Sequence, residues 1–219
     1  MPNILEKYYN NIDKKYGINS LRKKKILSLA ALEDSSKSRI MDIGCAEGYL
    51  SAALKKPSNY VVGLDISEKN INEAKKVLDQ AIVFDIESED WPNDFIENKF
   101  DLIVCAEVIE HLFDQDGAIA KISKILKPDG RLIISSPNFL VWNNRLRILF
   151  GHYGAKEIFF DQGHIHLLSY NGLKDKFEKN GFQIVAEDNL WYPNNLEFFK
   201  LILPKNLFIY QSIICLKNK

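Results

Sequence analysis

Two glycines and two acidic residues in the first third of the chain are spaced for binding a small ligand. Asp42 lies in a short apolar segment, Gly44 and Gly48 follow it, and Asp65 ends a second apolar segment. Glycines between a strand and a helix let backbone N–H groups approach a ligand closely. An acid at the position of Asp65 can accept both hydroxyls of a ribose, so the pattern predicts a nucleoside-containing cofactor.

The same segment argues against a dinucleotide. The dinucleotide fingerprint has three glycines that leave room for a pyrophosphate, whereas here the middle position is Ala46 and the bulky Tyr49 follows Gly48. The Asp42 carboxylate would repel a pyrophosphate and attract an ammonium or a sulfonium group. This charge pattern fits S-adenosylmethionine (SAM), which carries both cationic groups.

The segment 42–48, Asp-Ile-Gly-Cys-Ala-Glu-Gly, closely resembles the SAM-binding motif of class I methyltransferases, in which Asp-x-Gly-Cys-Gly-x-Gly is usual. Four further segments match in order, at 63–67, 84–87, 100–112 and 126–135, and the departure at Ala46 adds only a methyl group. The resemblance implies SAM as cofactor, with contacts from Asp42, Gly44, Ala46, Gly48, Asp65, Ile66, Asp85, Ile86 and Glu107.

The resemblance also gives individual roles to the adenine side of that set. It implies that Asp65 holds the ribose, that Asp85 accepts the adenine amino group, that the Ile86 N–H meets a ring nitrogen, and that Ile66 forms an apolar wall. The alternative for Asp65 is a structural role at the start of the next helix, near Ser67.

Glu107, Glu110 and His111 carry the residue types needed for catalysis. If they lie on a helix, these positions share one face. The trio could then bind a divalent cation, or His111 could act as an acid/base oriented by a glutamate. The run resembles that of two groups, the ubiquinone-biosynthesis O-methyltransferases and the small-RNA 2′-O-methyltransferases, and the second group uses such a run with a later histidine to hold a metal.

A later pair of histidines, His164 and His166, lies before a predicted helix. If residues 163–167 are extended, both side chains point to the same face and could reach the site. We expect His111 to be the catalytic acid/base, with His164 or His166 as second candidates, and no metal. The structural alternative places His166 at the base of a lid and leaves Glu110 as a solvated helix acid.

Short, nearly continuous runs of Ile, Val and Leu predict strands near 39–43, 60–64, 81–84, 100–104 and 131–135, alternating with helices near 48–55, 67–79 and 117–126. Helices are also expected at 4–16, 20–33, 141–149 and 169–180, and the last strands at 182–188 and 207–216. The predicted fold is α/β, a Rossmann-like seven-stranded mixed sheet with helices on both faces and a lid insertion at about 136–168. A single domain over 1–219 is expected.

Charge and cysteine content limit the partners. The 29 basic and 29 acidic residues cancel, so nucleic acid is not expected, and we interpret the basic run at 22–25 as a solvated helix face. An odd count of three cysteines indicates reduced thiols and a cytoplasmic location. No apolar stretch reaches the ~20 residues of a membrane span. The sequence gives no indication of oligomeric state.

The leading functional hypothesis is a SAM-dependent methyltransferase acting on a small-molecule or metabolite acceptor, with oxygen as the expected acceptor atom. A metal-dependent RNA 2′-O-methyltransferase is an alternative that rests on the Glu-x-x-Glu-His run and the later histidines. A non-catalytic SAM-binding protein is a further alternative. The sequence does not name the acceptor.

Overall fold

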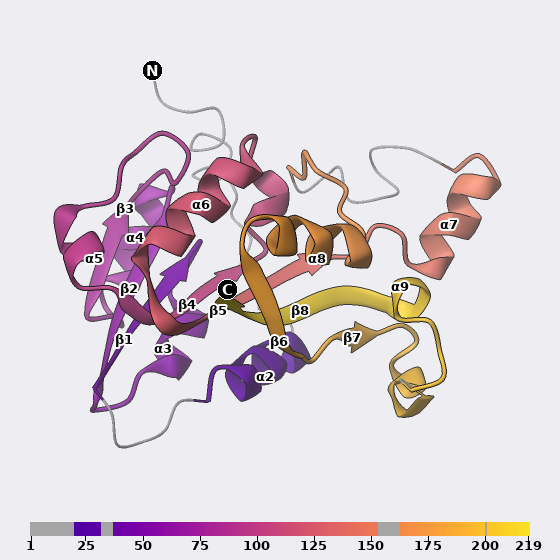
Figure 1. Ribbon diagram of the computed structural model, residues 1–219, viewed down its shortest axis with the longest axis horizontal. Coiled ribbons are helices and arrows are strands. Elements are labelled where there is room, and N and C mark those ends of the chain that lie inside the picture. The colour runs from indigo at the N-terminus through magenta and orange to yellow at the C-terminus, as the bar shows by residue number, and fades with distance from the viewer. Residues whose placement is uncertain (1–19, 32–36, 153–162, 200) are drawn as a thin grey trace.

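The computed structural model describes residues 20–31, 37–152, 163–199 and 201–219. Its centre is one mixed sheet in the order β3-β2-β1-β4-β5-β8-β6, with a short eighth strand, β7, paired to β8 (Figure 1). The strands are β1 Ser38–Ile43, β2 Asn59–Asp65, β3 Gln80–Val83, β4 Phe100–Ala106, β5 Leu126–Pro137, β6 Phe182–Glu187, β7 Leu190–Trp191 and β8 Ile209–Asn218. The predicted seven-stranded mixed sheet is confirmed, and β7 is an addition of only two residues.

Strands β1 to β5 are parallel to one another, and β8 runs antiparallel to both β5 and β6. The helices are α2 Ser20–Leu29, α3 Tyr49–Leu54, α4 Glu68–Ala74, α5 Asn93–Glu97, α6 Gln115–Ile125, α7 Trp142–Leu149, α8 Tyr170–Lys179 and α9 Lys205–Phe208, with 3-10 helices η1 Ile109–His111 and η3 Asn194–Phe199. The helix expected at 4–16 lies outside the described residues.

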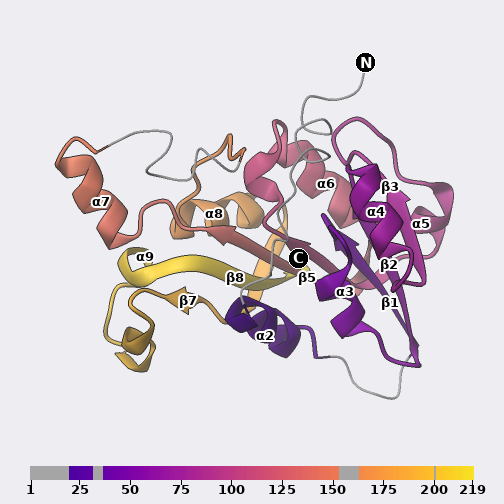
Figure 2. The same cartoon turned by 180° about the vertical axis from the view of Figure 1, so that it is seen from behind.

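Alternation along the strands explains why helices cover both faces. The adjacent residues Ile40 and Met41 belong to different hydrophobic clusters, because successive side chains of a strand point to opposite faces. The cluster with Met41 also contains Phe177 of α8, whereas that with Ile40 contains Ile26 of α2. Figure 1 and the reverse view in Figure 2 show α6 and α8 on one side of the sheet and α2 and α3 on the other.

Two predicted helix starts are confirmed by their caps. The Ser67 hydroxyl accepts a hydrogen bond from the N–H of Asn70 at 3.3 Å, and α4 follows. The Ser169 hydroxyl accepts one from the N–H of Gly172 at 3.0 Å, and α8 follows. Such caps satisfy N–H groups that a helix cannot satisfy itself. Helix α8 also ends where predicted, just before Gly181, which has a φ of 85°.

The register brings the functional segments to one edge of the sheet. Ile43 at the end of β1 pairs with Leu64 of β2 and with Cys105 of β4, so the loops after these three strands meet. Ligands of open α/β sheets bind beyond this carboxyl edge. The sheet therefore brings together the segments that follow β1, β2 and β4, which carry most of the predicted site residues.

Candidate functional site

The glycine turn after β1 has the backbone geometry that its residues predict. Gly44 and Gly48 have φ angles of 75° and 82°, and Ala46 has a φ of 47°, in the left-handed region that disfavours side chains. A Cβ on Gly44 would lie 2.3 Å from Cγ2 of Val108, so the turn has no room for one. The strained Ala46 is consistent with a functional turn, because such conformations persist only where the surroundings impose them.

Asp65 connects this turn to the end of β2. Its Oδ2 accepts a hydrogen bond from the Ala46 N–H at 2.9 Å, and its Oδ1 accepts one from the Ser67 N–H at 2.8 Å. The structural role considered for Asp65 is thus present, and the carboxylate also lines the cavity described below. Burial raises the pKa of Asp65, although these hydrogen bonds oppose the effect.

Asp42 is buried beneath the turn. Its Oδ2 accepts a short hydrogen bond from the Ser51 hydroxyl at the start of the following helix. Burial raises the pKa of Asp42 to about 7, the Ser51 hydrogen bond lowers it, and the charge of Asp65 raises it further. A cation nearby would favour the ionised form of this carboxyl, which is the response expected of a group that faces a sulfonium or an amino group.

A cavity of about 290 Å³ opens at this edge of the sheet. Most predicted site residues line it, namely Asp42, Gly44, Ala46, Asp65, Ile66, Asp85, Ile86, Glu107, His111 and His164. Gly48 and His166 do not. Gly48 lies behind the turn, where a Cβ would be 3.1 Å from Val77, and His166 borders a much smaller cavity on the other side of His164.

The loop after β3, which carries Asp85 and Ile86, is held by a lysine that the sequence did not single out. The Lys121 ammonium of α6 donates to the carbonyls of Ile86 at 2.9 Å, Glu87 at 3.3 Å and Glu89 at 2.8 Å. Asp85 Oδ1 accepts the Glu87 N–H at 3.0 Å. The loop that carries Asp85 and Ile86 is therefore fixed before any ligand arrives.

The shared helical face predicted for Glu107, Glu110 and His111 is wrong. Strand β4 continues to Ala106, and Glu107 forms a left-handed turn at φ 58° before the three-residue helix η1. Glu107 Oε1 accepts hydrogen bonds from Ser135 and Gln211, which stand on β5 and β8. Glu107 therefore stands outside η1, and residues of β5 and β8 hold its carboxylate.

The basic run at 22–25 is not a uniformly solvated face. Arg22 lines the cavity and pairs with Glu107 Oε2 at 3.1 Å. The buried Lys25 pairs with Asp188 at 2.6 Å and with Glu197 at 2.7 Å, so that expectation is wrong for both residues. Among the described residues that line the cavity, Arg22 is the only lysine or arginine. Arg22 lies four positions before the apolar Ile26, so the two residues share a face of the helix. This spacing was the sequence signal that Arg22 faces the protein and not the solvent.

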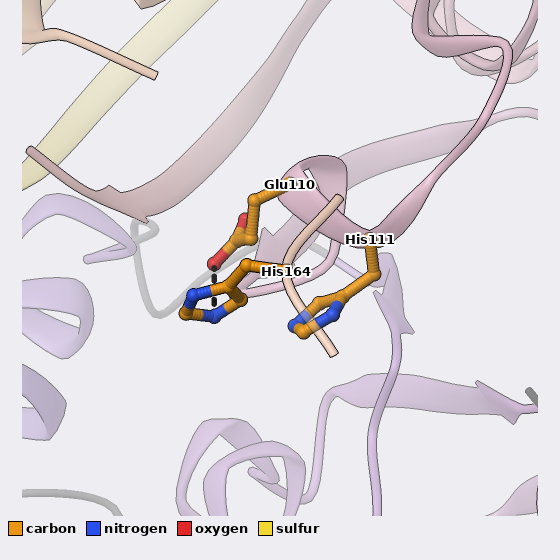
Figure 3. Close-up of side chains that lie close together, drawn as sticks. All are labelled: Glu110, His111 and His164. Carbon is orange, nitrogen blue, oxygen red and sulfur yellow. Dashed lines mark ion pairs between the residues drawn. The ribbon is translucent and has the colours of Figure 1, made fainter. Parts of the chain in front are cut away.

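Glu110, His111 and His164 lie close together (Figure 3), and the two histidines line the cavity. Glu110 is only 1% exposed, so it is not the solvated acid considered from the sequence. Its Oε1 lies 3.9 Å from His164 Nε2, and the rings of His111 and His164 are 4.7 Å apart. The backbone carbonyl of Glu110 accepts hydrogen bonds from the N–H groups of Ile165 and His166, which attach the segment carrying His164 to η1.

Burial determines the protonation of this cluster. It raises the pKa of Glu110 well above its usual range, and the charge of Glu107 adds to the effect. Burial also lowers the pKa of His111 and lowers that of His164 to about 4, where the neighbouring His111 contributes. Both imidazoles are therefore neutral near pH 7, and the contact between Glu110 and His164 is not a charged pair there.

The region expected to form a lid contributes little to the large cavity. Of the described residues between 136 and 168, only His164 lines it, while Pro137, Phe139 and His166 border the small one. Helix α7 lies at the opposite end of the molecule from β1 to β3 in both views (Figures 1 and 2). Residues 153–162 lie outside the described part of the chain.

None of the helices in the described part of the chain has the length and apolar composition of a membrane span.

Comparisons with known proteins identify the family of the chain. A family model described as a methyltransferase domain matches residues 16–187. Ubiquinone biosynthesis O-methyltransferase of Actinobacillus pleuropneumoniae is 30% identical over 125 residues, which cover 54% of this chain and 53% of that protein. The protein of the same name from Pelagibacter ubique is 37% identical over 103 residues, covering 46% of this chain and 42% of the relative. The matched segment thus spans about half the length of these curated relatives.

A solved structure shares the fold over nearly the whole chain. Magnesium protoporphyrin IX methyltransferase from Synechocystis, with bound S-adenosylhomocysteine (SAH), superposes with a TM-score of 0.67 and covers 99% of both chains. Its sequence is only 16% identical, so this likeness shows the fold alone.

Proposed function

Because this chain belongs to the methyltransferase domain family, whose model matches residues 16–187, and uses SAM, we propose that it methylates an oxygen atom of a small-molecule acceptor. The observation that carries the proposal is that His111 and His164 line the large cavity, with the buried Glu110 close to both. The two histidines offer neutral imidazoles next to the place where the reacting methyl group would lie.

The polar groups of the cavity match the charges of SAM. Asp65 would hold the ribose hydroxyls, and the carboxylates of Asp42 and Glu107 would face a cofactor with a cationic sulfonium and amino group. Arg22 would bind the cofactor's own carboxylate, because it supplies the positive charge among the described lining residues. Asp85 and Ile86 would meet the adenine on the loop that Lys121 holds.

Methyl transfer to a hydroxyl releases one proton. The acceptor oxygen attacks the methyl carbon, the bond from that carbon to sulfur breaks, and the sulfonium becomes the neutral thioether of SAH. A neutral His111, with His164 as the second candidate, would accept the hydroxyl proton. Placement of the acceptor in line with the methyl group, with water excluded, would supply much of the rate. His166 is a weaker candidate because it borders the small cavity instead.

A small-molecule acceptor is favoured by the names of the curated relatives and by the balanced charge of the chain. A polyanionic acceptor such as RNA would need basic side chains around the site. Arg22 is the only one that lines the cavity within the described residues, and it is paired with Glu107.

The test is SAH formation from SAM with a panel of phenols, catechols, aliphatic alcohols and amines. We expect turnover with one class of hydroxyl compound, and a loss of about 10²–10⁴-fold in rate for His111→Ala with SAH binding retained. Turnover restricted to amines would contradict oxygen as the acceptor atom. Tight SAH binding without turnover on any acceptor, short RNA included, would favour the non-catalytic alternative.

A further inference from the structure

The ion pair between Arg22 and Glu107 stands inside the large cavity, and both side chains line it. SAM and SAH end in an α-amino acid group, which carries an ammonium and a carboxylate close together. On the basis of the cofactor placement in the proposed function, we propose that this pair opens when the cofactor binds. Glu107 then takes the ammonium and Arg22 takes the carboxylate, so the closed pair selects for ligands that carry a complete amino acid group.

The Glu107 carboxylate is held in place by residues other than Arg22. Its Oε1 accepts hydrogen bonds from the Ser135 hydroxyl at 2.9 Å and from the side-chain amide of Gln211. The Glu107 N–H also donates to the Ser135 carbonyl at 3.0 Å. These contacts leave Oε2, which pairs with Arg22 at 3.1 Å, as the oxygen on which one cation can replace another. Ser135 and Gln211 are thus positioning residues that hold the carboxylate for either cation.

The Arg22 guanidinium is only partly satisfied in the closed pair. Its Nη1 contacts Glu107, whereas its Nε is buried and has no hydrogen-bond partner among the described residues. A guanidinium can bind a carboxylate through two parallel N–H···O bonds. A cofactor carboxylate bound in this way would use the Nε that the closed pair leaves without a partner.

Helix α2 can stay in place while Arg22 changes partners. The buried Lys25 attaches the middle of the helix to Asp188 at 2.6 Å. The Arg131 guanidinium attaches its end by donating to the Leu29 carbonyl at 3.0 Å. Both attachments lie on the C-terminal side of Arg22, so the exchange requires only a new rotamer of the Arg22 side chain.

Neither member of the pair can leave without a replacement. Burial raises the pKa of Glu107, and the positive charge of Arg22 is the strongest opposing effect. Breaking a buried ion pair leaves uncompensated charges and is strongly unfavourable. A ligand with both an ammonium and a carboxylate replaces both partners at once. A nucleoside without these groups replaces neither, so it binds with the pair closed.

Calorimetric titrations with two ligands test the proposal. Methylthioadenosine keeps the adenosine and the thioether sulfur of SAH but lacks the amino acid group. Both ligands are titrated into wild type, Arg22→Ala, Glu107→Gln and the double variant. Methylthioadenosine should bind all four proteins within about twofold, because distant substitutions that share no partner with it leave its affinity nearly unchanged.

SAH should bind each single variant more weakly, by about tenfold. The loss in the double variant should exceed the product of the two single losses. Each single substitution removes the attraction that the wild type must break, and the double substitution removes it only once. Lys76 and Glu73 form an exposed pair at 2.7 Å away from the cavity, so Lys76→Ala and Glu73→Gln are matched controls and should bind both ligands normally.

A loss in the double variant no greater than the product of the single losses would overturn the proposal, as would equal weakening of the two ligands. If a variant fails to fold, crystal structures of the wild type with each ligand decide the question. The pair should be open with SAH and closed with methylthioadenosine, and any other result contradicts the exchange. These measurements use no acceptor, so a closed pair with SAH bound leaves the proposed methyl transfer in place. Absence of SAH binding to the wild type would overturn both proposals.

Discussion

Arg22 and Glu107 form an ion pair of 3.1 Å that joins helix α2 to the end of strand β4. Both side chains line the large cavity, and the Glu107 carboxylate also accepts hydrogen bonds from Ser135 of β5 and Gln211 of β8. Arg22 and Glu107, which are far apart in the chain, thus form one charged cluster at the cavity. Because this pair is only partly exposed, its two groups interact more strongly than a surface pair would.

Arg22→Ala should weaken SAH binding by about 10- to 100-fold, because a charge-assisted hydrogen bond contributes about 1.5–3 kcal/mol. Calorimetric titration with SAH measures the effect. Lys24→Ala, an exposed position in the same basic run, is the control and should bind normally. An unchanged dissociation constant for Arg22→Ala would exclude this residue as the partner of the cofactor carboxylate.

Asp65→Ala should reduce SAH affinity by a similar factor, since the ribose hydroxyls would lose a charged acceptor. The variant also loses the hydrogen bonds from the N–H groups of Ala46 and Ser67, so thermal unfolding should be recorded with the titration. NAD should not bind the wild type under the same conditions. If Asp65→Ala is less stable yet binds SAH as tightly as the exposed-acid control Asp175→Ala, Asp65 has only the structural role.

Gly44→Val should abolish SAH binding while circular dichroism still shows a folded chain. The new Cβ meets Val108, and the left-handed φ of 75° adds backbone strain. Gly181→Val carries a comparable φ of 85° with nothing within 4 Å of the added Cβ, so it tests the strain without the clash. Normal SAH binding by Gly44→Val would show that the turn does not contact the cofactor.

Acid should destabilise the protein partly through His164. Its pKa is lowered from 6.5 to about 4 on folding, so between these values the unfolded chain binds the extra proton. Stability from this group is present above pH 6.5 and is lost as the pH falls toward 4, by an amount on the order of 3 kcal/mol. The raised pKa of Glu110 acts in the opposite direction, because folding then favours its protonated form.

Unfolding in denaturant across pH 4 to 7, for wild type and for His164→Gln, isolates the histidine's contribution. The wild type should lose more stability over this range than the variant. Equal slopes for the two proteins would mean that His164 is protonated as readily in the folded state as in the unfolded chain.

The sequence by itself determined the features that depend only on residues close together in the chain. Short, nearly continuous apolar runs predicted the strands, glycines predicted the turn at 44–48, and Ser67 and Ser169 predicted the starts of two helices. These features follow from backbone sterics and local hydrogen bonds, so they can be read from short windows.

Only the tertiary structure decided how the chemical groups are combined. The Glu107 carboxylate is held by Gln211, which is 104 residues away in the chain. The cavity position of Arg22 and the selection of His164 over His166 also depend on packing between distant segments. Such contacts are set by the burial of whole helices and strands against one another, and no local pattern of residues records them.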